Sequence, residues 1–160
     1  LHLLTAKPLL FAINAIGGNI SESLKTKTKE YEGEYIVLDI KSELESSGFS
    51  AEERSELEVG SSQLEKLIQT SYTLLHLITF LTTGEDETRA WTIRSEVRAP
   101  EAAGTIHSDF EKKFIRADVI SWQSLLNEGG WSQARSRGLV RSEGKGYVVQ
   151  DGDVLEIKHG

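Results

Sequence analysis

The chain has 160 residues, of which 38% are apolar, 27% are charged and 8% are aromatic, and its mean hydropathy is −0.31. This composition is typical of a globular protein and argues against disordered, collagen-like and membrane-spanning classes. The sequence contains no cysteine, which excludes disulfides, thiolate nucleophiles and cysteine-bound metals. We therefore expect a cytoplasmic protein with no membrane association and no disulfide partner.

The net charge of −7 is unevenly distributed along the chain. Residues 1–88 contain 7 Lys and Arg against 15 Asp and Glu, whereas residues 89–160 contain 11 against 10. The second part can therefore present a basic face to an RNA, if its acidic side chains point elsewhere. The alternative is a solvated surface of mixed charge. The candidate cations of a basic face are Arg89, Arg94, Arg98, Lys112, Lys113 and Arg116, with a further group at Arg135, Arg137, Arg141 and Lys145.

The first elements in chain order alternate between buried strands and polar segments. An apolar run over residues 7–13 ends at Asn14 and precedes Gly17, which predicts a buried strand that leads into a loop. Residues 21–34 predict a surface helix or loop, and residues 35–40 predict a second buried strand. A strand, a polar crossover and a strand favour an α/β fold here.

Two capping signatures and a change of periodicity mark the middle of the chain. The segments 50–53 and 62–65 each carry a serine followed three residues later by a glutamate, so a helix should begin at each. The second helix is amphipathic and should end near His76. The β-branched and aromatic runs at 77–83 and 89–94 then predict a hairpin.

The rest of the chain predicts a compact α+β arrangement. We expect a loop over 99–104, a short helix capped by Ser108, a strand over 117–120, and short helices over 121–126 and 131–137.

The sequence should close with a hairpin. Strands at 147–149 and 154–158 flank Asp151-Gly152, a turn signal. A hairpin, a helix, a strand and a closing hairpin resemble the β-grasp layout of ubiquitin. A ubiquitin-like modifier or sulfur carrier needs a Gly-Gly tail, and this chain ends in Lys158-His159-Gly160.

The sequence lacks the motifs of common catalytic centres. It has no GxxxxGK[S/T] loop, no GxSxG elbow and no histidine spacing that suits a metal, so we assign no catalytic residue and no metal ligand. The chain alone is not expected to hydrolyse nucleotides. Because it contains no methionine and begins with Leu1, we interpret it as a fragment of a longer gene product.

Asn14 is a candidate binding residue. Ligands of α/β sheets bind outside the carboxyl ends of parallel strands, where this amide should lie. An Asx turn is the structural alternative.

Two long stretches resemble the TGS domain of the YchF and Obg-like ATPase family: "GEDETRAWTIRSEVRAPEAAGTIHSDFEKKFIRADV" and "GKGYVVQDGDVLEIK". The resemblance extends back through "LEKLIQTSYTLLHLITFLTTG" and, more weakly, through "KPLLFAINAIGG" and "VLDIKSELE". It implies that residues 1–76 are the C-terminal part of an Obg-type P-loop nucleotide-binding domain, an α/β remnant. Residues 77–160 would be a complete α+β TGS domain of the β-grasp type.

The resemblance implies a magnesium-dependent hydrolase of ATP, or of GTP, that associates with ribosomes. The family reads the nucleotide base with an Asn-x-x-Glu motif and a later Ser-Ala-Lys-like motif, which carry over to Asn14, the backbone of Ala15, and Lys41. Gly17 stands where the family has an acidic residue, so the preference between ATP and GTP stays open. ATP or GTP and magnesium are expected in the intact protein and not on this chain alone.

The TGS half has its own implied partner, the ribosome or its RNA. Its cations alternate with Trp91, Phe110, Phe114 and Trp122, which suits phosphate contacts and base stacking. Core packing is the alternative role of these aromatic residues. A protein that acts only as a TGS docking module is the alternative to a nucleotide hydrolase.

Overall fold

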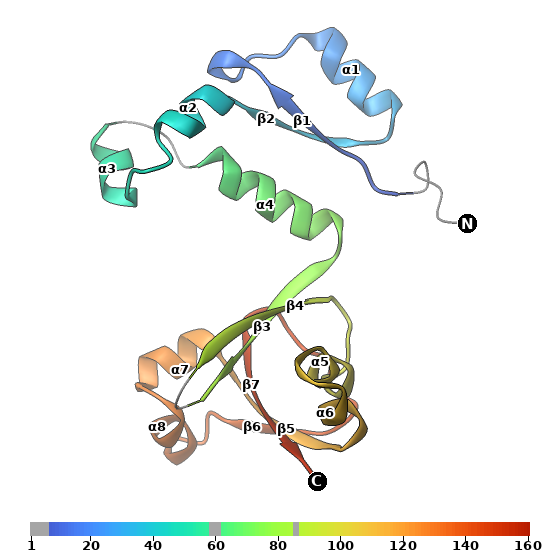
Figure 1. Cartoon of the computed structure of the whole chain (residues 1–160), viewed down its shortest axis with the longest axis vertical. Coiled ribbons are helices and arrows are strands. Elements are labelled where there is room, and N and C mark those ends of the chain that lie inside the picture. Colours follow the sequence, from blue (N-terminus) through green and yellow to red (C-terminus); the bar gives the residue numbers. More distant parts are fainter. Residues whose placement is uncertain (1–6, 58–61, 85–86) are drawn as a thin grey trace. The chain divides into compact units, whose positions relative to one another are not determined.

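The computed structural model describes residues 7–57, 62–84 and 87–160 (Figure 1). The chain divides into two compact units, Leu1–Leu75 and His76–Gly160. Each unit is described by itself below.

Unit 1 is built on a two-stranded parallel sheet. The strands pair in register from Leu10 with Glu34 to Asn14 with Leu38. Because parallel strands need a crossover, a helix connects them. The elements of unit 1 are β1 (Leu10–Asn14), a 3₁₀ turn (Ile16–Gly18), α1 (Glu22–Glu30), β2 (Glu34–Leu38), α2 (Ile40–Glu45), α3 (Ala51–Glu56) and α4 (Gln63–Leu74).

Side-chain caps fix most of the helix starts in unit 1. Ser21 accepts from the backbone N–H of Leu24 at the start of α1, and Asp39 accepts from Ser42 at the start of α2. The predicted capping box at Ser50 is confirmed. Helix α4 begins where we predicted, but Ser62 does not cap it. Its hydroxyl donates to Glu43 instead, because that carboxylate also accepts from the first backbone N–H of α4.

The core of unit 1 is small. Ile36 and Leu38 are its buried apolar side chains among the described residues, while Leu9, Ile40 and Leu64 are exposed. A sheet of two parallel strands with so little burial is at the lower limit of stability.

Unit 2 contains a mixed five-stranded sheet in the order β4-β3-β7-β5-β6. The predicted hairpin of β3 and β4 is confirmed, from Leu77 opposite Arg94 to Thr83 opposite Thr88. β7 lies in the middle, parallel to β3 and antiparallel to β5. The elements are β3 (Leu77–Thr83), β4 (Thr88–Arg94), α5 (Ala99–Ile106), α6 (Ser108–Lys112), β5 (Phe114–Ser121), α7 (Trp122–Glu128), α8 (Trp131–Ser136), β6 (Arg141–Glu143) and β7 (Asp153–His159).

Both faces of the sheet are covered by helices (Figure 1). On one face Phe80, Val119 and Leu155 pack with the buried alanines of α5 in the larger apolar cluster. On the other face Ile120 and Val154 pack against Ala134 of α8 in a smaller cluster. The alternation along each strand produces the two faces, since successive side chains of a strand point to opposite sides.

Two sequence predictions for the helices of unit 2 are wrong. Residues 99–104 form most of helix α5, because Pro100 is tolerated in the first turn and small alanines fit closely under the sheet. The cap of α6 is His107, whose Nδ1 accepts from the backbone N–H of Asp109, and not Ser108.

The predicted closing hairpin does not form. Residues 147–149 make only an isolated bridge between Val148 and Arg98, and β7 pairs with β5 and β3 instead. The Asp151-Gly152 turn exists, but it leads into the centre of the sheet. No helix in the described part of the chain is long and apolar enough to cross a membrane.

Candidate functional site

The loops that follow β1 and β2 meet at the carboxyl ends of the two strands. Asn14 Oδ1 accepts from the backbone N–H of Ile40 at 3.3 Å, and the N–H of Ala15 donates to the carbonyl of Leu38 at 2.9 Å. Asn14 is therefore not in an isolated Asx turn: its side chain joins the two loops. This is the edge of a parallel sheet at which α/β proteins hold ligands.

Asp39 brings a carboxylate to the same edge. Its Oδ2 accepts from the backbone N–H of Gly17 at 3.2 Å. The backbone N–H groups of Ser42 and then Gly17 hold the pKa of Asp39 below its usual value, so it is ionised near neutral pH. A carboxylate from the second loop thus lies beside position 17 of the first loop. Sequence reasoning missed Asp39, although its place at the end of the second strand was a usable signal.

Gln63 supports this edge from behind. Its Oε1 accepts from the backbone N–H of Asp39 at 2.6 Å, which ties the start of α4 to the second loop. Lys41, the third residue implied by the resemblance, lies in α2. Its side chain is 79% exposed, with its ammonium 3.8 Å from Glu45. The structure therefore brings Asn14 and Ala15 together with Asp39, while Lys41 extends along its own helix.

Glu43 anchors the helices behind the edge. Its carboxylate accepts from the backbone N–H of Gln63 at 2.8 Å and from the Ser62 hydroxyl at 2.9 Å, and Arg54 lies 3.9 Å away. These donors, the Gln63 N–H foremost, lower the pKa of Glu43. The negative charge of Glu43 therefore stabilises the arrangement of α2, α3 and α4.

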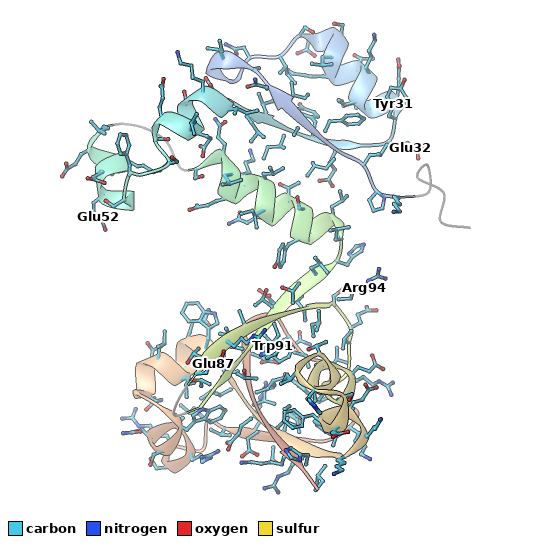
Figure 2. The ribbon with its side chains drawn as sticks, in the orientation of Figure 1. Tyr31, Glu32, Glu52, Glu87, Trp91 and Arg94 are labelled. Carbon is cyan, nitrogen blue, oxygen red and sulfur yellow. The ribbon has the colours of Figure 1, made fainter. Side chains whose placement is uncertain are left out.

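Some cations of unit 2 form ion pairs, and others form none among the described residues. Arg98 and Lys112, both predicted to face RNA, line one open cavity of about 530 Å³ with Lys145. Arg89 lies over the ring of Trp91, with its guanidinium carbon 4.2 Å from the ring centroid. The remaining candidates are Arg94 and Lys113, which have no ion pair among the described residues, and Arg116, which lies 4.0 Å from Asp118. Figure 2 shows Trp91 and Arg94 on strand β4.

The candidate stacking aromatics are mostly part of the core. Phe114 is 2% exposed, and Phe110 and Trp91 pack against the larger apolar cluster. Trp122, the exception, is 42% exposed at the start of α7. Core packing is thus the observed role of three of the four residues.

A network around Tyr147 closes the loop before β7. The Tyr147 hydroxyl donates to Oδ2 of the buried Asp153 at 2.6 Å and accepts from Arg141 at 3.0 Å. Burial, together with the hydrogen bond to Asp153, raises the pKa of Tyr147 to about 12. These groups satisfy one another, so the network is structural.

The described residues contain no group of three or more His, Asp or Glu side chains that could hold a metal ion. In the same residues we find no cradle for a triphosphate. At the ends of β1 and β2, the Asn14 carboxamide carries both donors and an acceptor, and the Asp39 carboxylate carries acceptors.

Comparisons with known proteins show which family the chain resembles. The family model YchF-GTPase_C, described as "Protein of unknown function (DUF933)", matches residues 77–160. The "Ribosome-binding ATPase YchF" of Bacillus subtilis is 44% identical over 99% of this chain and 46% of its own length. Human "Obg-like ATPase 1" is 37% identical over 98% of this chain and 43% of its own length.

A solved structure shows the same fold. The "Structure of the Schizosaccharomyces pombe YchF GTPase" matches 96% of this chain and 44% of that chain, with a TM-score of 0.76 and 33% sequence identity. The fold and the comparisons together define a mixed α/β protein related to nucleotide hydrolases. The chain belongs to the YchF family and spans less than half the length of the relatives it matches. The predicted family resemblance is thereby confirmed.

Proposed function

We propose that this chain is part of a magnesium-dependent hydrolase of ATP or GTP that associates with ribosomes in the cytoplasm. Residues 1–76 would complete its nucleotide-binding domain, and residues 77–160 would be a β-grasp TGS domain. The names of the relatives support this proposal, since they include ribosome-binding ATPases. The chain itself has no phosphate-binding loop, so hydrolysis belongs to the longer protein.

The proposed nucleotide binding rests on one observation, the convergence of two loops at the ends of β1 and β2. Asn14 ends β1 and Asp39 follows β2, and each side chain accepts a hydrogen bond from a backbone N–H of the other loop. We propose that this pair contacts the base, with the backbone of Ala15 beside it. Lys41 is the second residue of α2, and its long aliphatic chain would pack on the base only after leaving Glu45.

Sequencing the gene upstream of the Leu1 codon is the first test. An in-frame extension that encodes a GxxxxGK[S/T] loop supports the hydrolase. A start codon immediately before Leu1 would support the alternative, a TGS docking module without nucleotide chemistry.

Substitution of Asp39 tests the base contact in the extended protein. A carboxylate only accepts hydrogen bonds, whereas an amide also donates. We expect Asp39→Asn to change the ratio of ATP to GTP affinity by about fivefold or more. Lys29→Gln, an exposed change on α1, is the control. An unchanged ratio in equilibrium binding would remove Asp39 from the base edge.

The ribosome part of the proposal concerns unit 2. Its unpaired cations support contacts with RNA phosphates, which weaken steeply with salt. We expect residues 77–160 to co-sediment with ribosomes at low salt and to be released as the salt concentration rises. Failure to co-sediment at low salt would contradict docking by this unit.

A further inference from the structure

The face of unit 2 that carries α5 and α6 has an open cavity of about 530 Å³. We call it the α5–α6 cavity. Its lining consists of three cations, two carboxylates and one proline from three separate segments: Arg98, Pro100, Glu101, Glu111, Lys112 and Lys145.

Backbone hydrogen bonds hold together the segments that carry two of the three cavity cations, Arg98 and Lys145. The N–H of Ala99 donates to the carbonyl of Tyr147 at 2.9 Å, and the N–H of Val149 donates to that of Val97 at 3.0 Å. These bonds flank the bridge between Arg98 and Val148. The loop that carries Lys145 is therefore fixed beside the segment that carries Arg98.

The third cavity cation comes from α6, which lies close to α5. A Cβ added to Gly104 would lie 2.5 Å from Oε2 of Glu111, so the missing side chain permits this approach. The same contact places the Glu111 carboxylate against α5, which also carries Glu101. Lys112 follows Glu111 and borders the cavity from α6.

The charged groups of the cavity lack partners within the part of the chain that the structure describes. None of the three cations or two carboxylates forms an ion pair or a side-chain hydrogen bond there. The cations on the opposite face of the sheet differ. Arg135 contacts Asp118 and Glu156, and Arg137 lies 3.1 Å from Glu128. The cavity thus keeps its charges available for a ligand.

The two carboxylates narrow the class of ligand. A site for phosphate alone is weakened by nearby negative charge. An ionised carboxylate can only accept hydrogen bonds, so its partner must be a donor. RNA provides such a donor, the 2′-hydroxyl of the ribose next to each phosphate. DNA lacks that hydroxyl.

We propose that the α5–α6 cavity binds single-stranded RNA backbone, with phosphates on the three cavity cations and a 2′-hydroxyl donating to a cavity carboxylate. This inference rests on the proposed docking function and adds to it a particular site and a preference for RNA over DNA. It also selects Arg98, Lys112 and Lys145 among the predicted cations.

The test compares a uridine oligonucleotide with its 2′-deoxyuridine counterpart, so that only the hydroxyl differs. Binding of the intact 160-residue chain is followed by fluorescence anisotropy over a range of salt concentrations. We expect the ribose form to bind about fivefold more tightly or better. Equal affinities for the two oligonucleotides would overturn the proposal.

Two sets of variants locate the site. The triple change Arg98→Gln, Lys112→Gln and Lys145→Gln should lower affinity at least about tenfold and reduce the slope of log affinity against log salt by about 2. The control removes the same number of exposed cations from unit 1, outside the cavity: Lys27→Gln, Lys29→Gln and Lys66→Gln. If the control loses as much affinity as the cavity variant, the assignment to the cavity is wrong.

A second pair of changes tests the carboxylates. Glu101→Gln with Glu111→Gln keeps the shape of both side chains but removes their charge. We expect this variant to bind both oligonucleotides at least as tightly as the parent chain, while the ratio between them falls to within about twofold. A ratio that stays unchanged would contradict the role of the carboxylates. Thermal unfolding of each variant confirms that it is folded.

Ribosome co-sedimentation separates this inference from the proposed function. If the chain co-sediments with ribosomes but shows no preference for the ribose oligonucleotide, the docking function is supported and the proposed RNA site is contradicted. If the chain prefers the ribose oligonucleotide but does not co-sediment with ribosomes, the cavity is supported as an RNA site and the docking function is contradicted.

Discussion

Tyr147 donates a short hydrogen bond to a buried carboxylate, and its titration should affect the stability of unit 2. Burial and the contact with Asp153 raise its pKa to about 12, from a usual value of 10.0. A raised pKa in the folded state means that stabilisation is complete below about pH 10 and is lost as pH rises through about 12. We expect urea unfolding to show this loss in the parent chain and not in Tyr147→Phe.

The variant should also be less stable near neutral pH. Removing the hydroxyl leaves Asp153 without one of its donors, which costs about 1–2 kcal/mol. Because Tyr147 is the only tyrosine in residues 77–160, tyrosinate absorbance in that segment reports on it alone. An ordinary titration near pH 10 would show that the network is not formed in solution.

Glu43 gives unit 1 the opposite pH dependence. Its pKa in the folded state lies below the usual 4.5, so its stabilisation is present above about pH 4.5 and is lost as pH falls through the folded value. We expect Glu43→Gln to cost about 1–2 kcal/mol near neutral pH and almost nothing at about pH 3. Circular dichroism of thermal unfolding at the two pH values measures the difference. Glu45→Gln, an exposed change in the same helix, should have little effect at either pH.

At the scale of elements, the turn before β7 depends on Gly152. Its φ is +77°, and a Cβ there would lie 2.7 Å from Cδ1 of Trp122. Its N–H donates to Thr79 and its carbonyl accepts from Trp122, so the turn joins β3 to α7. We expect Gly152→Ala to destabilise unit 2 by about 2 kcal/mol and to change the fluorescence of Trp122. Gly146→Ala, where a Cβ meets nothing within 4 Å, is the control, and equal losses from both changes would refute the explanation.

Local patterns predicted the elements better than their pairing. The hairpin of β3 and β4 was predictable because its partners are neighbours in sequence. The pairing of β7 could not be predicted in this way. The Asp-Gly turn suggested a local hairpin, whereas the apolar side chains of β7 pack on both faces of the sheet. Helix α5 was hidden by Pro100 and Gly104, which read as loop residues although a first turn admits the proline.

The candidate site was predictable in part for the same reason. Asn14 could be found because it follows an apolar run directly. Asp39 belongs to a different loop, and its approach to Gly17 depends on the parallel pairing of two strands far apart in the sequence. The α5–α6 cavity likewise unites residues of three segments, which spacing along the chain cannot reveal.

At the scale of the whole molecule, the two units should differ in stability. Unit 2 contains most of the buried apolar side chains, while the sheet of unit 1 has two strands. We expect residues 77–160 to fold alone with a cooperative transition, and amide exchange in the chain to be much faster in β1 than in β7. Strong protection across Leu10–Asn14 would contradict this expectation.

The position of β7 affects when unit 2 can assemble during synthesis. β7 is the last strand of the unit to be made, yet it lies between β3 and β5 in the sheet. The hairpin of β3 and β4 can form early, but it cannot join β5 until the final strand has left the translating ribosome. Unit 2 should therefore complete its fold only after β7 has emerged from the ribosome, with its apolar faces exposed until then.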